Sequence, residues 1–74
     1  MTSTPLNAAL AALIELMHER VERANRIATA ARACAGLGNF DEAIRITLSI
    51  DEPLYEATAL SNAAALIKRA ADDR

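Results

Sequence analysis

The sequence predicts a small, soluble, all-α protein, built from antiparallel helical hairpins with three or four helices or as a small bundle. Three observations predict this class. Alanine, the best helix former, is the commonest residue. Apolar residues recur at spacings of three and four. The two glycines and two prolines fall between the stretches that carry this pattern. Residues 1–74 are expected to form one domain, with frayed ends at 1–4 and 72–74.

The composition predicts a thin core that a second chain completes. Hydrophobic residues make up 53% of the chain but aromatic residues only 3%, namely Phe40 and Tyr55. One core in 74 residues supplies little stability, so small domains usually need a disulfide, a metal or a partner. Cys34 is the only cysteine and His18 the only histidine, so self-association as a homodimer is the expected remedy.

The first half of the chain predicts either one long helix or two shorter ones. Thr4 and Pro5 are residues that favour a helix start. No glycine or proline lies between Leu6 and Ala35, so one helix of about 30 residues is possible. Glu19 and Glu22 stand four residues before arginines, a spacing that supports helix. The expected apolar faces are Leu6, Leu10, Leu13, Ile14 and Met17, followed by Val21, Ala24, Ile27, Ala28, Ala31 and Cys34.

A weak internal repeat favours two helices in this region. When the chain is shifted by 33 residues, apolar positions fall on apolar positions: Val21 on Leu54, Ala24 on Ala57, Ile27 on Leu60. A period near 33 is typical of helical-hairpin repeats. It predicts a turn near His18, with a break between Met17 and Arg20 and four helices in all.

The second half predicts two further helices. Gly36 to Asn39 form the clearest turn, in which glycine supplies a left-handed cap and Asn39 caps the next helix, with Glu42 placed for a capping box. That helix is expected to end near Ile50, and residues 51–53 are expected to form a turn and a new helix start, since proline suits the first turn of a helix. Its expected inner face is Phe40, Ala43, Ile44 and Thr47, followed by Leu48 and Ile50. The expected face of the last helix is Leu54, Ala57, Leu60, Ala64 and Ile67.

Residues 38–44, which read Gly-Asn-Phe-Asp-Glu-Ala-Ile, resemble the centre of a tetratricopeptide repeat. The resemblance covers about one degenerate repeat, residues 27–53, and the early Pro53 departs from the family. It implies a TPR-like hairpin that binds protein or peptide on a concave face, with no particular ligand. The residues that carry the motif are Gly38, Asn39, Phe40, Glu42, Ala43 and Pro53.

No residue pattern predicts a catalytic, cofactor or metal site. His18 is read as a surface residue and Cys34 as a small core residue. Glu15, Glu19 and Glu22 lack a second histidine-bearing partner for a carboxylate metal site. The chain is therefore expected to be non-enzymatic and to need no cofactor.

The expected function is protein–protein interaction, as an adaptor, scaffold or chaperone-like subunit that self-associates or binds a protein or peptide helix. The expected interface is the surplus of apolar residues on the first and last helices: Leu13, Ile14, Leu16, Ala59, Leu66 and Ala70. The alternative is a small dimeric regulator that binds nucleic acid through Arg20, Arg23, Arg26 and Arg32, although the net charge of −2 disfavours it. A subunit of a larger complex is a third reading. No signal peptide or membrane span is evident, and a lone cysteine fits the cytoplasm.

Overall fold

The computed structural model describes residues 4–73, and every element among them is helical. The helix α1 runs over Thr4–Gly36, α2 over Phe40–Thr47 and α3 over Asp51–Asp72, with the short 3-10 helix η1 over Leu48–Ile50 between α2 and α3. The all-α prediction is confirmed. The expected fraying of residues 1–3 and 74 lies outside the described residues.

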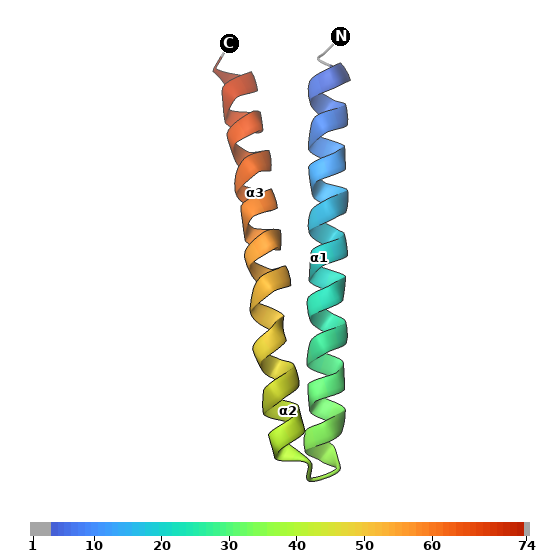
Figure 1. The fold of residues 1–74 in the computed structure, drawn as a ribbon. Coiled ribbons are helices and arrows are strands. Elements are labelled where there is room, and N and C mark those ends of the chain that lie inside the picture. The colour runs from blue at the N-terminus through green and yellow to red at the C-terminus, as the bar shows by residue number, and fades with distance from the viewer. Residues whose placement is uncertain (1–3, 74) are drawn as a thin grey trace.

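The elements form two long rods rather than three or four separate helices, so the expected number of helices is wrong. Figure 1 shows α1 as one rod, with α2, η1 and α3 following each other end to end as the second rod. The rods lie side by side with opposite chain directions, and both termini are at the end away from the turn. The Cα atoms extend over 56 × 16 × 12 Å.

The helix α1 continues through the region where a break was predicted. It is helical from Met17 through Arg20 and reaches 33 residues in total, so the prediction of a turn near His18 is wrong. Two physical reasons account for this. No residue in the stretch breaks a helix. The second rod also gives α1 a partner along its length, and such packing supplies most of the stability of a helix.

The turn between the rods is a Schellman motif centred on Gly38. Gly38 has φ +83°, the left-handed conformation that glycine adopts without steric cost. The N–H of Asn39 donates to Cys34 O at 2.9 Å, and the N–H of Gly38 donates to Ala35 O at 3.0 Å. These two bonds satisfy carbonyls that the end of α1 would otherwise leave free.

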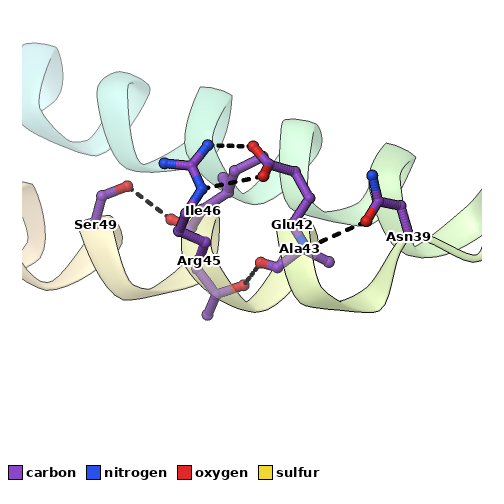
Figure 2. A network of polar contacts seen from close by, with 7 residues as sticks. Asn39, Glu42, Ala43, Arg45, Ile46 and Ser49 are labelled. Carbon is purple, nitrogen blue, oxygen red and sulfur yellow. Dashed lines mark hydrogen bonds and ion pairs between the residues drawn. The ribbon is translucent and has the colours of Figure 1, made fainter.

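Asn39 caps the second rod as predicted. Its side-chain oxygen accepts a hydrogen bond from the N–H of Glu42 at 3.3 Å. The reciprocal half of the expected capping box is replaced, because the Glu42 carboxylate pairs with Arg45 instead. Figure 2 shows this cap and the polar contacts that follow it along the rod.

Pro53 changes the backbone hydrogen-bonding pattern locally, but the second rod continues past it. Proline lacks an N–H and crowds the carbonyl four residues earlier, here that of Ser49. Ser49 lies in η1, where the backbone leaves the α-helical pattern for three residues before α3 begins at Asp51. The helix α2 thus ends at Thr47, somewhat before the expected position near Ile50. The expected turn at residues 51–53 is wrong, because these residues are helical in α3 and the chain continues in the same direction (Figure 1).

The rods meet along a seam that repeats every seven residues, as in a coiled coil. Spacings of three and four alternate without interruption in both rods. The seam positions of α1 are Leu6, Leu10, Leu13, Met17, Arg20, Ala24, Ile27, Ala31 and Cys34. Those of the second rod are Ala43, Ile46, Ile50, Pro53, Ala57, Leu60, Ala64, Ile67 and Ala71. Each of these positions is buried or partly buried.

The seam also explains the 33-residue repeat. Ala24 and Ala57 occupy equivalent seam positions, and so do Ile27 and Leu60, because the heptads of the two rods are offset by 33 residues. The similarity therefore reflects two rods with the same heptad pattern, and no additional turn is needed to account for it.

Only small side chains are fully enclosed. Among the described residues, the buried ones are Ala24, Ala31, Ala43, Ala57 and Pro53. The expected inner face of the second rod is partly wrong. Phe40 and Ile44 are 64% and 62% exposed, and Thr47 and Leu48 are also exposed.

Candidate interface

The heptad pattern divides the surface of the hairpin into two sides. One side of the seam carries the residue before Ala24 in α1 and the residue before Ala57 in the second rod, together with the residues at multiples of seven positions from each. The other side carries the residue after Leu13 in α1 and the residue after Pro53 in the second rod, together with the residues at multiples of seven positions from each. Because the rods run in opposite directions, corresponding flanks of the two rods face the same way. The two sides differ sharply in chemistry.

The charged side carries the ion pairs that join the rods. Arg20 Nε lies 2.8 Å from Glu56 Oε1, and Arg23 Nη2 lies 3.4 Å from Glu52 Oε1. The first contact is an ion pair without hydrogen-bond geometry, so the buried Glu56 Oε1 has no hydrogen bond. In both pairs the two residue numbers add to 75 or 76. A residue of α1 therefore lies at the level of the residue in the second rod that completes this sum, and this relation gives the register of the rods.

Glu42 and Arg45 extend the charged side toward the turn. Arg45 Nε donates to Glu42 Oε1 at 3.0 Å, and a second guanidinium nitrogen bonds the other carboxylate oxygen (Figure 2). The hydrogen bonds from Arg45, together with its positive charge, lower the pKa of Glu42. The same hydrogen bonds and the negative charge of Glu42 raise the pKa of Arg45. The expected pairings of Glu19 and Glu22 with the arginine four residues on are not the ones formed, because Glu19 pairs with Arg20 and Glu22 lies beside His18.

The opposite side, here called the apolar side, has Thr47 and Ser61 on its flanking line and also carries six apolar residues: Ile14, Val21 and Ala28 of α1 with Phe40, Leu54 and the neighbouring Ile44 of the second rod. All six are exposed. Leu48 and Tyr55, 70% and 77% exposed, lie at its outer edge. The ion pairs that join the rods lie on the charged side.

An open hollow of about 320 Å³ adjoins the apolar side on α1. It is lined by Asn25, Ala28, Thr29 and Arg32. These residues have the spacing i, i+3, i+4 and i+7, which is the set of four that receives a side chain from a facing helix in knobs-into-holes packing.

The structure separates the residues of the predicted interface. Leu13 lies in the seam and is partly buried against the second rod. Ile14 lies on the apolar side. The other four form a smaller apolar patch on the charged side near the termini, and all four are exposed: Leu16, Ala59, Leu66 and Ala70.

Sequence reasoning misplaced three of the exposed apolar residues, because it assigned Phe40, Ile44 and Leu48 to the inner face. The signal that could have shown their exposure is the line of apolar residues that begins at Ala43 and Ile46 and continues along the second rod with alternating spacings of three and four residues. Once that line is taken as the seam, Phe40 and Ile44 fall outside it.

The remaining candidate residues form no site. His18 is exposed, with Nε2 at 3.6 Å from Glu22 Oε2. Cys34 is a partly buried seam residue. Within residues 4–73, no group of three or more His, Cys, Asp or Glu side chains is placed to hold a metal ion. In that same stretch, no helix is long and apolar enough to cross a membrane.

Comparisons with family models, with curated proteins and with solved structures give no match to this chain.

Proposed function

We propose that this chain is a non-enzymatic protein–protein interaction module that self-associates, as an adaptor, scaffold or chaperone-like subunit of the cytoplasm. The observation that carries the proposal is the burial pattern. No leucine, isoleucine, valine, methionine or phenylalanine among residues 5–73 is buried, and ten large hydrophobic side chains are exposed. Patches of this kind on a small protein mark interaction surfaces.

The surface area supports the same conclusion. A compact monomer of 7.9 kDa exposes about 4,400 Å². This chain exposes 5505 Å². Its radius of gyration is 17.1 Å, against about 11 Å for a compact domain of 74 residues. The hairpin alone thus leaves about 1,100 Å² more surface in water than its mass requires, by the same scaling.

The test is the mass of the particle in solution. Light scattering on a sizing column across a concentration range should give a multiple of 7.9 kDa, with helicity preserved in circular dichroism. A folded monomer down to nanomolar concentration would refute self-association. A poorly folded or aggregated isolated chain would instead favour a subunit that needs a different partner.

The resemblance of residues 27–53 to a tetratricopeptide repeat stays a prediction, and it points to the same class of function. The alternative of nucleic-acid binding has weaker support. Arg20 and Arg23 are paired with Glu56 and Glu52, so part of the basic stretch is already neutralised. Retention on heparin at low salt, lost as salt rises, would favour this alternative.

A further inference from the structure

We propose that the apolar side is the surface on which a second copy of this chain packs, with the two turns at the same end, so that two hairpins close into a four-helix bundle. This inference rests on the proposed self-association and adds the face and the geometry. It is argued from area, from shape and from the distribution of apolar residues along the rods.

The area of the side matches what a stable dimer needs. A stable interface buries about 800 Å² on each partner. One broad side of the hairpin spans 56 by 16 Å between Cα atoms, a footprint of about 900 Å² in which the apolar residues take up roughly the half nearer the turn and polar residues the rest. Burying it would remove most of the surface that the monomer exposes in excess of a compact protein of the same mass.

The distribution of apolar residues selects the apolar side over the charged side. The side chains of Phe40, Ile44 and Leu54 are 64%, 62% and 44% exposed and follow one another along the second rod. Val21 is 47% exposed at the facing edge of α1. On the charged side, Arg20, Arg23 and their glutamates would have to lose water on docking, which costs free energy. Docking on the apolar side would cover Arg32 beside the hollow.

The same distribution selects the orientation. On the second rod, the apolar residues of this side lie between the turn and the middle of the hairpin, whereas Ser61 and Lys68 occupy the corresponding flank near the termini. On α1, Val21 and Ala28 lie in the same part of the hairpin and Ile14 lies nearer the termini. If the turns pointed in opposite directions over the whole length, Ile44 of one copy would lie beside Lys68 of the other, whose ammonium is paired with Asp72. With the turns at the same end, the two apolar halves cover each other.

The hollow on α1 fits this orientation. The ion pairs between the rods place Arg32 at the level of Ile44 and Ala28 at the level of Leu48. A two-fold axis along the hairpin lays the second rod of one copy over α1 of the other without changing levels. Ile44 of the second copy then lies at the Arg32 end of the hollow, and Leu48 lies at the level of Ala28 in its lining.

A matched pair of variants tests the face. Ile44→Asp and Leu66→Asp make the same change at aliphatic residues that are 62% and 58% exposed on opposite sides of the hairpin. We expect Ile44→Asp to raise the dimer dissociation constant at least about 30-fold, and Leu66→Asp to change it less than about threefold. If Leu66→Asp dissociates the dimer and Ile44→Asp does not, the face is wrong while self-association stands. If the unsubstituted chain is a monomer, both the proposed face and the proposed self-association are overturned.

A distance measurement tests the orientation without disturbing the interface. One spin label is attached at Leu37→Cys in the turn, in a chain whose native thiol is removed by Cys34→Ala. Turns at the same end place the two labels about 20 Å apart, which is two helix diameters. A separation approaching the 56 Å length of the hairpin would show opposite ends and overturn the orientation.

Discussion

Two glycines that flank the turn should respond in opposite directions to the same substitution. Gly36 is the last residue of α1, and Gly38 has φ +83°. A Cβ atom at either position would meet no atom within 4 Å, so the side chain itself costs nothing and the backbone alone decides. Gly36→Ala should raise the free energy of unfolding by about 0.5–1 kcal/mol. Gly38→Ala should lower it by about 1–2 kcal/mol.

Thermal unfolding followed by circular dichroism at one fixed protein concentration measures both effects. A change of 1 kcal/mol shifts the Tm of a domain this size by about 4–8 °C. The two variants should therefore melt on opposite sides of the parent, separated by roughly 6 °C or more. Equal melting temperatures, or a Gly38→Ala variant more stable than the parent, would refute the assignment of the left-handed turn to Gly38.

Two further perturbations test the seam and the charged side. Ala24→Leu should destabilise the protein by about 1–3 kcal/mol, because Ala24 lies at the level of the fully buried Pro53 and the seam has no room for a larger side chain. The same change at the exposed Ala33 is the control, and an Ala24→Leu variant that melts higher than the parent would show an open seam. The lowered pKa of Glu42 gives a pH dependence. Its pairing with Arg45 contributes stability above the usual value of 4.5, and this contribution is lost as the pH falls through the lowered pKa. Between pH 7 and pH 3, the melting temperature should fall more in that acid range for the parent than for Glu42→Gln. An identical pH dependence of the two melting temperatures would show that the pair contributes no stability.

The local features of the chain were accessible from the sequence, because they depend on neighbours a few residues apart. The helical class followed from alanine content and spacing. The cap at Asn39 and the left-handed glycine before it followed from their chemistry. The interruption of the α-helical pattern at η1, which includes the carbonyl four residues before Pro53, followed from the proline ring and its missing N–H.

The long-range features were not accessible in the same way. The ion pairs of Arg20 and Arg23 reach Glu56 and Glu52 across the seam. Helical spacing alone predicted partners four residues away on the same helix. The exposure of Phe40 and Ile44 was also not predicted. Spacing alone allows either the line through these two residues or the line through Ala43 and Ile46 to be the buried one.

By itself, then, the sequence determined that this protein is helical, where its turn lies and that its core is too thin to bury its large apolar side chains. The tertiary structure decided which of the competing apolar lines became the seam. The physical reason is the close approach of two long rods. Alanines at the seam permit that approach, and once Ala24, Ala31, Ala43 and Ala57 are enclosed, the larger side chains at the flanks are left in water.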